Sequence, residues 1–72
     1  MPMPEITFPL TAEFIELHKL LKATGLCESG GLAKYMISES KVLVDGKVET
    51  RKACKIRRGQ RVEYDGQTIS VL

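Results

Sequence analysis

The densest group of charged side chains lies between residues 51 and 61. These eleven residues hold six bases and no acid: Arg51, Lys52, Lys55, Arg57, Arg58 and Arg61. Like charges packed this closely repel one another and lower the stability of the folded chain. A polyanionic partner would relieve that repulsion, whereas the plainer interpretation is a solvated basic face. The stretch therefore predicts an anionic partner, with the solvated face as the alternative.

A second candidate site is Ser29-Gly30-Gly31, where a short helix is expected to begin. The N-terminus of a helix presents unpaired N–H groups and a partial positive charge, which suit a phosphate. Two glycines let an anion approach the backbone, and Lys34 follows one turn later. The alternative is a flexible turn with Ser29 as an ordinary cap, and the spacing does not decide between the two. A Walker-type pattern is absent from the sequence, so nucleotide hydrolysis is not indicated.

Side chains suited to catalysis or metal binding are sparse. His18 is the one histidine, so a two-histidine metal site is impossible, and we expect it half-buried at the edge of an apolar helix face. Cys27 and Cys54 belong to no C-x-x-C pair, and reduced thiols that pack as small apolar residues are expected. The acidic residues fall on outer helix faces and turns. The sequence thus predicts a protein that is not an enzyme and needs no metal or cofactor.

The length and the charge balance narrow the class of protein. A chain of 72 residues holds one domain with one small core. Residues 1–33 carry two lysines and four glutamates, a net charge of −2, while residues 34–72 carry nine bases and five acids, a net charge of +4. No apolar run reaches the roughly 18 residues of a membrane helix, and a signal peptide is not indicated. We expect a cytoplasmic monomer.

The first ten residues differ in composition from the rest. They contain all three prolines, which favours an extended lead-in over residues 1–10. Residues 5–8 of this segment could add a short edge strand. Residues 11–72 are then expected to form a single domain.

Apolar residues at helical spacing predict a first helix over residues 12–24. Thr11 is the expected N-cap, and Glu13 would lie in the first turn, where the helix dipole favours an anion. Phe14 would begin the apolar face. Gly25 suits the left-handed position that ends many helices.

A second, shorter helix is expected over residues 31–38, capped by Ser29. It must pack on the first helix, because so short a helix is unstable alone. Tyr35 falls off its apolar face, and whether Tyr35 stacks on a base stays open. That face consists of Leu32, Ala33, Met36 and Ile37.

From Lys41 the hydrophobic period changes to two, which predicts strands. Asp45-Gly46 and Asp65-Gly66 are hairpin signals, and Arg58-Gly59 is a further turn. Ile56 is expected to anchor an exposed connection to the core, and Tyr64 to pack in the core. The expected strands cover residues 41–44, 47–49, 61–64 and 68–72. The order predicts an α+β fold of two N-terminal helices packed on a small, twisted antiparallel sheet.

Three motifs in this order resemble a known family. They are the run from Ser29 to Ile37 with Ala33-Lys34, the run Lys41-Val42-Leu43-Val44-Asp45-Gly46, and the run Ile56-Arg57-Arg58-Gly59-Gln60-Arg61-Val62. The chain resembles, over about residues 11–71, the RNA-binding domain family named after small-subunit ribosomal protein S-four. It is most similar to the small stand-alone members, the YbcJ type, which carry the Gly-Gly helix start.

The resemblance implies the compact fold known as the alpha-L motif and a partner that is structured RNA, usually ribosomal or transfer RNA. Lys34 matches the basic residue after the helix alanine, and Arg51 and Lys55 match basic positions of the stand-alone subgroup. Gly30 stands where most of the wider family has Arg, and Gln60 where it has Asp. The predicted RNA-binding residues are Gly30, Gly31, Lys34, Lys41, Lys47, Arg51, Lys52, Lys55, Arg57, Arg58 and Arg61.

Two other functions are compatible with parts of the sequence. One is a protein-interaction module whose basic face meets an acidic protein. The other is a ubiquitin-like sulfur carrier, which has a similar hairpin half but needs a Gly-Gly C-terminus. The sequence ends Ser70-Val71-Leu72, which disfavours the sulfur carrier. A non-catalytic RNA-binding role linked to ribosome assembly or translation is the preferred hypothesis.

Overall fold

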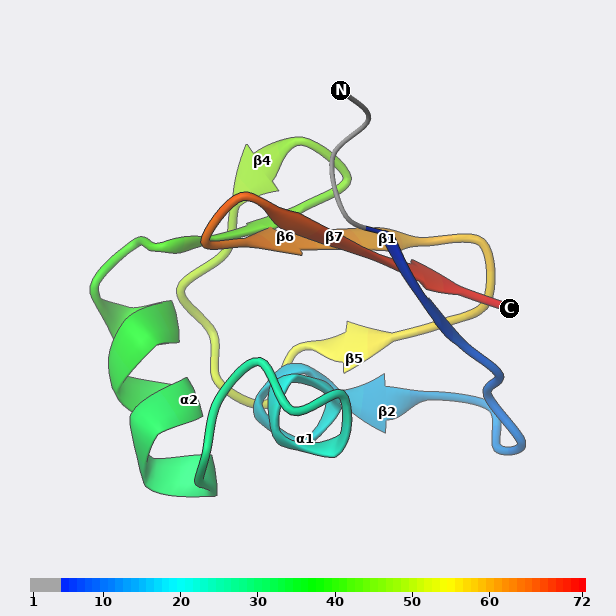
Figure 1. Ribbon diagram of the computed structural model, residues 1–72, viewed down its shortest axis with the longest axis horizontal. Coiled ribbons are helices and arrows are strands. Elements are labelled where there is room, and N and C mark those ends of the chain that lie inside the picture. Colours follow the sequence, from blue (N-terminus) through cyan, green and yellow to red (C-terminus); the bar gives the residue numbers. More distant parts are fainter. Residues whose placement is uncertain (1–4) are drawn as a thin grey trace.

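The computed structural model describes residues 5–72, in which a sheet lies over two helices (Figure 1). The larger sheet has five strands in the order β1-β7-β6-β3-β4, and a second sheet pairs β2 with β5. The elements in chain order are β1 (Glu5–Phe8), β2 (Ile15–Glu16), α1 (Leu17–Ala23), α2 (Gly30–Ser38), β3 (Val42–Val44), β4 (Lys47–Val48), β5 (Lys55–Ile56), β6 (Arg61–Tyr64) and β7 (Gln67–Val71). The α+β class is confirmed.

The sheet is mixed rather than antiparallel, which corrects the sequence-based expectation. The edge strand expected over residues 5–8 is present, but β1 pairs with β7 in parallel, in the register Ile6 to Ile69. Backbone bonds from the Leu72 N–H to the Phe8 carbonyl and from the Leu10 N–H to the Leu72 carbonyl, both 2.9 Å, extend this pairing. The direction of such a strand depends on the path of the intervening chain, which a local pattern does not report.

Helix α1 begins at Leu17, five residues later than expected, and Thr11 is not its cap. Ile15 and Glu16 instead pair with Ile56 and Lys55 as strand β2. Glu16 occupies the N-cap position without a side-chain cap bond. Glu13 therefore lies outside the first turn. The far end agrees with the expectation, since Gly25 follows the helix with φ +82°.

The first N–H groups of α1 are satisfied by the chain that surrounds β5. The Leu17 N–H donates to the Cys54 carbonyl at 2.9 Å, and the His18 N–H donates to the Lys52 carbonyl at 3.1 Å. A buried helix end needs such partners. The start of α1 is thus fixed by a segment distant in sequence, which is why the local pattern placed it too early.

Helix α2 agrees with the sequence-based expectation to within one residue. The Leu32 N–H donates to the Ser29 hydroxyl oxygen at 3.1 Å, so Ser29 is the cap. Ala33 and Ile37 are fully buried where α2 packs on α1, and Tyr35 is exposed. The apolar face predicted for this helix is confirmed.

The hairpin turns also agree with the sequence. Asp45 and Gly46 have φ values of 51° and 83°, and Asp65 and Gly66 have values of 51° and 74°. Two positive φ values in a two-residue loop are the mark of a type I′ turn. These turns join β3 to β4 and β6 to β7 in antiparallel register.

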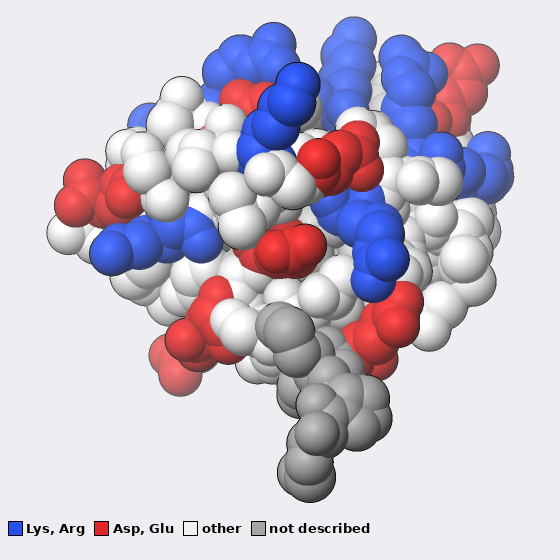
Figure 2. All heavy atoms as spheres, turned by 90° about the horizontal axis from the view of Figure 1, so that it is seen from above, with Lys and Arg blue, Asp and Glu red and all other residues white. Residues whose placement is uncertain are grey.

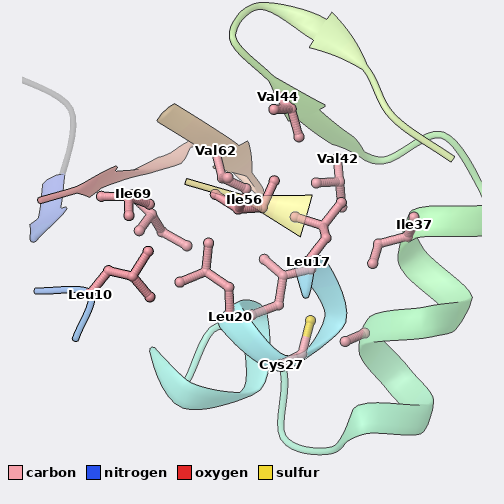
Figure 3. Close-up of a cluster of buried hydrophobic side chains, with 13 residues drawn as sticks. Leu10, Leu17, Leu20, Cys27, Ile37, Val42, Val44, Ile56, Val62 and Ile69 are labelled. Atoms are coloured by element: carbon pink, nitrogen blue, oxygen red, sulfur yellow. The ribbon is translucent and has the colours of Figure 1, made fainter. Parts of the chain in front are cut away.

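A single apolar core lies between the sheet and the helices (Figure 3). Ile56 is fully buried in it, as expected, and Tyr64 packs against it. Leu10 is also buried, so residues 5–10 pack against the core, while residues 1–4 of the expected lead-in lie outside the described residues. Between residues 5 and 72, no helix is long and apolar enough to cross a membrane.

Candidate functional site

The predicted RNA-binding side chains are all exposed, but they are not one continuous group. Lys34 lies on α2, Lys47 lies on β4, and the others lie on connections or at the starts of strands. Figure 2 shows the outer face of the sheet, where basic and acidic side chains are interspersed and the basic ones are denser along one edge. The count of bases in the sequence therefore overstates the positive charge available at any one place.

Arg51 is held by an acid. Its Nε and Nη2 atoms donate to the two carboxylate oxygens of Glu49 at 3.0 and 3.1 Å, and its backbone N–H donates to the same group at 3.0 Å. These hydrogen bonds hold the pKa of Glu49 down at about 2. Arg51 Nη2 also lies 3.8 Å from the Cys54 sulfur. The Arg51 charge is thus largely paired within the fold.

The segment around Arg51 borders an open depression of about 430 Å³. Arg51, Ala53, Cys54 and Lys55 line it. The Lys52 and Cys54 carbonyls of this segment bond to the start of α1, so the backbone under the depression is held in place. Lys55 is exposed at its rim. Within residues 5–72 Lys55 forms no ion pair, so the depression offers this cation beside the paired Arg51.

Phe14 is the residue that the sequence analysis missed. It was expected on the apolar face of the first helix, but it precedes both β2 and α1. Lys55 Nζ lies 4.8 Å from the centroid of its ring, and Arg57 Cζ lies 5.9 Å from the same centroid. Its spacing from Leu17 fits a helix, so no local signal distinguished it. The structure brings Lys55 and Arg57 together around this ring.

Arg58 and Arg61 lie near the N-terminal strand instead. Arg58 Nη2 donates to the Leu10 carbonyl at 2.6 Å, and Arg61 Nη2 lies 3.9 Å from a carboxylate oxygen of Glu5. Both side chains therefore help to tie residues 5–10 to the rest of the fold. If Arg58 or Arg61 contacts RNA, the RNA competes with these internal partners for the same side chain.

Gln60 links the turn before β6 to the β3–β4 hairpin. Its side-chain carbonyl accepts from the Arg57 N–H at 2.7 Å, and its amide donates to Asp45 at 3.0 Å. The bonds from Gln60 and from the Arg61 N–H lower the pKa of the Asp45 carboxyl. An acid at position 60 would face Asp45, so the glutamine suits this environment.

The start of α2 is open to solvent. A side chain at Gly30 would meet nothing within 4 Å, and one at Gly31 would approach only the Ser29 hydroxyl, at 3.9 Å. Neither glycine has a positive φ. The fold itself gives no steric or conformational reason for glycine at these two positions. Lys34 is exposed one turn further along the helix.

Lys41 belongs to a separate place beyond the far end of α2. It lines a shallow depression of about 290 Å³ with Met36, Tyr64 and Asp65. The candidate residues thus fall into separate groups. Arg51 and Lys55 line one depression, Lys55 and Arg57 share the Phe14 ring, and Arg58 and Arg61 border the N-terminal strand. Lys34 belongs to α2, Lys47 to the β3–β4 hairpin and Lys41 to the second depression.

The side chains suited to catalysis or metal binding are the histidine and the two cysteines. His18 is half-buried on α1, with Nε2 3.4 Å from a Glu16 oxygen. Cys27 is buried, Cys54 is half-buried, and both are free thiols whose pKa is raised by burial. Over residues 5–72, no three His, Cys, Asp or Glu side chains are grouped so that they could hold a metal ion.

Comparisons with known proteins agree on one family. A family model described as the S4 domain matches residues 8–72. YbcJ of Escherichia coli (strain K12), named as a candidate RNA-binding protein, is 52% identical over 58 residues, covering 81% of this chain and 83% of YbcJ. RlbA of Bacillus subtilis (strain 168), named as a candidate ribosome maturation protein, is 37% identical over 57 residues, covering 79% of this chain and 80% of RlbA.

A solved structure is similar over the whole chain. The solution structure of YbcJ from E. coli superposes with a TM-score of 0.73 at 46% sequence identity, covering 100% of this chain and 90% of that one. It is described as revealing an alpha-L motif involved in RNA binding. The two helices and the sheet described above therefore match a known architecture.

Proposed function

This chain belongs to the S4 domain family, and from that premise we propose that it is a non-catalytic protein that binds structured RNA through exposed cations. The observation that carries the proposal is the pair Lys55 and Arg57. Both are exposed, both are free of ion pairs within residues 5–72, and Lys55 lines the 430 Å³ depression. Exposed Lys and Arg side chains of this kind neutralise the phosphates of a nucleic-acid backbone.

The chemistry of the surface favours phosphates and shape over base sequence. A-form RNA presents phosphates and 2′-hydroxyls, and proteins recognise it mostly through these groups. The open start of α2 would seat a further phosphate on the N–H groups at Gly30 and Gly31, with Lys34 adding a full charge. Lys52, Lys41 and Lys47 supply additional positive charge around the domain.

The RNA that we propose is ribosomal or transfer RNA, and the process is ribosome assembly or translation. The support is the name of the relative RlbA, which refers to ribosome maturation. We further propose that the protein acts as a monomer in the cytoplasm, where its two free thiols would stay reduced.

Binding to E. coli ribosomal RNA fragments and total transfer RNA, followed by fluorescence anisotropy, tests the proposal. If about four phosphates are neutralised, affinity falls roughly 100-fold between about 50 and about 200 mM salt. A single-stranded oligonucleotide of the same length serves as the comparison for structure. Absence of binding at low salt, or an affinity that does not change with salt, would overturn the proposed function.

A further inference from the structure

Phe14 has an unusual environment for a phenylalanine. It is half-buried, yet among residues 5–72 it is not one of the partly buried apolar side chains that pack on the core. Two cations lie over its ring, with Lys55 Nζ 4.8 Å and Arg57 Cζ 5.9 Å from the ring centroid. The ring therefore contacts charged side chains at the surface and is not part of the apolar core.

The strand register explains this arrangement. Ile15 pairs with Ile56 and Glu16 with Lys55, so Phe14 continues the antiparallel register opposite Arg57. Side chains alternate along a strand, so Ile56 points into the core while Lys55 and Arg57 point to the other side. A residue directly opposite and its diagonal neighbour are both within reach of an aromatic side chain. The strand register thus places the Phe14 side chain within reach of both cations.

Two cations lie over one ring, and the acid opposite Lys55 in the register, Glu16, contacts His18 and Lys19 instead. The two cations repel one another, but the negative face of an aromatic ring attracts each of them. Within residues 5–72 neither cation takes part in an ion pair, in contrast to Arg51 with Glu49 and Arg61 with Glu5. Both residues are exposed, so both cations are available to phosphates.

We propose that Phe14 is a positioning residue that holds Lys55 and Arg57 as a two-cation clamp for the phosphate backbone of the RNA. The inference rests on the proposed function and deepens it. Holding the two side chains in advance reduces the conformational entropy lost when a phosphate binds. Phe14 itself contributes no charge, so its effect is on the geometry of the clamp and not on the number of phosphate contacts.

The decisive comparison is Phe14→Leu against Phe14→Tyr. Leucine stays apolar but removes the ring, whereas tyrosine keeps it. Phe14→Leu is expected to weaken binding to the ribosomal RNA fragments about two- to five-fold, and Phe14→Tyr to leave it unchanged. Because no charge is lost, the salt dependence of Phe14→Leu should equal that of the wild type. Equal affinity of Phe14→Leu and wild type would overturn the inference.

A second measurement reports on the clamp without RNA. The ring should shift the NMR signals of the Lys55 ε-methylene and Arg57 δ-methylene protons upfield, and Phe14→Leu should return both to ordinary values. Unchanged signals would show that the ring does not lie on these cations in solution. The same spectra show whether each variant is folded, so an affinity loss through unfolding is recognised.

A double-mutant cycle separates a positioning role from a general structural one. In the Lys55→Gln/Arg57→Gln background, Phe14→Leu should cause no further loss of affinity. A loss equal to that in the wild-type background would overturn the clamp while leaving RNA binding intact. If the wild type binds no RNA at low salt, the proposed function fails and the clamp fails with it. The two failures are therefore distinguishable.

Discussion

In the Glu49–Arg51 pair, one acid gives a basic residue a structural role within the fold. Arg51 forms two side-chain hydrogen bonds to Glu49, and its backbone N–H forms a third. A bidentate pair of this kind is among the surface pairs that contribute measurably to stability. We therefore expect Arg51 to act mainly on the segment that supports α1, although its residue type suggests a phosphate contact.

Glu49→Gln is expected to lower the free energy of unfolding at neutral pH by about 0.5–1 kcal/mol. The folded-state pKa of Glu49 is about 2, below its ordinary value of 4.5. Its stabilising contribution is therefore fully present above about pH 4.5 and is lost as pH falls towards 2. Urea unfolding of both proteins at several pH values measures this. A difference that stays constant from pH 7 down to pH 2 would contradict it.

Gly30 and Gly31 give a second residue-scale prediction. An added methyl group would meet open space at Gly30 and nearly so at Gly31, and alanine is the better helix former. Gly31→Ala should therefore raise the free energy of unfolding by up to about 1 kcal/mol. If a phosphate approaches the α2 start, the same change should weaken RNA binding.

Thermal unfolding and anisotropy on one preparation check both effects of Gly31→Ala. Ser38→Ala, at the other end of α2, is the control for a substitution in the same helix. A variant that is more stable and binds RNA as tightly as wild type would remove the α2 start from the interface.

At the scale of elements, α1 and β5 form one unit. The two-stranded β2–β5 sheet leads directly into α1, and the carbonyls of Lys52 and Cys54 complete the first turn of the helix. Ile56 joins this unit to the core, since it is fully buried. The segment that carries Lys55 and Arg57 is therefore attached to the start of a helix and is not a loose loop.

Ile56→Ala is expected to lower the free energy of unfolding by about 2–5 kcal/mol, a large part of the stability of a domain this small. Ile56→Val should cost about 1 kcal/mol and provides a folded comparison. In Ile56→Val, the amide protons of Leu17 and His18 should exchange faster, because their acceptors lie beside the substituted strand. Hydrogen exchange followed by NMR measures this. Unchanged exchange at both amides would show that α1 and β5 open independently.

On the scale of the whole molecule, the charge available to a partner is smaller than the sequence suggests. Arg51 and Arg61 face Glu49 and Glu5, while Lys55 and Arg57 face an aromatic ring. The outer face of the sheet mixes both signs of charge (Figure 2). A partner rich in phosphate should therefore bind at restricted places on this surface.

Two double variants that remove the same number of charges test this difference. Lys55→Gln/Arg57→Gln should reduce the slope of log affinity against log salt by about 2, because each cation neutralises one phosphate. Arg51→Gln/Arg61→Gln should reduce it by less, because those cations are already paired. Anisotropy titrations at several salt concentrations measure both slopes. Equal reductions would show that the internal pairs open when RNA binds.

Much of the site could be predicted only as a list of residue types. The sequence located the basic stretch and the Gly-Gly helix start, and the motifs around them led to the correct family. It could not tell that Arg61 lies beside Glu5 or Arg57 beside Phe14, because each of these partners is distant along the chain. Whether the predicted residues contact RNA stays a prediction.

The elements that the sequence determined by itself are those whose hydrogen bonds close within a few residues. Helix α2 with its Ser29 cap and the two type I′ hairpins belong to this class, since their conformation follows from local side chains and positive φ values. The start of α1, the parallel pairing of β1 and the placement of Phe14 were decided only by the tertiary structure. Each depends on hydrogen bonds or contacts to a segment distant in sequence, and the energy of such contacts is absent from any local pattern.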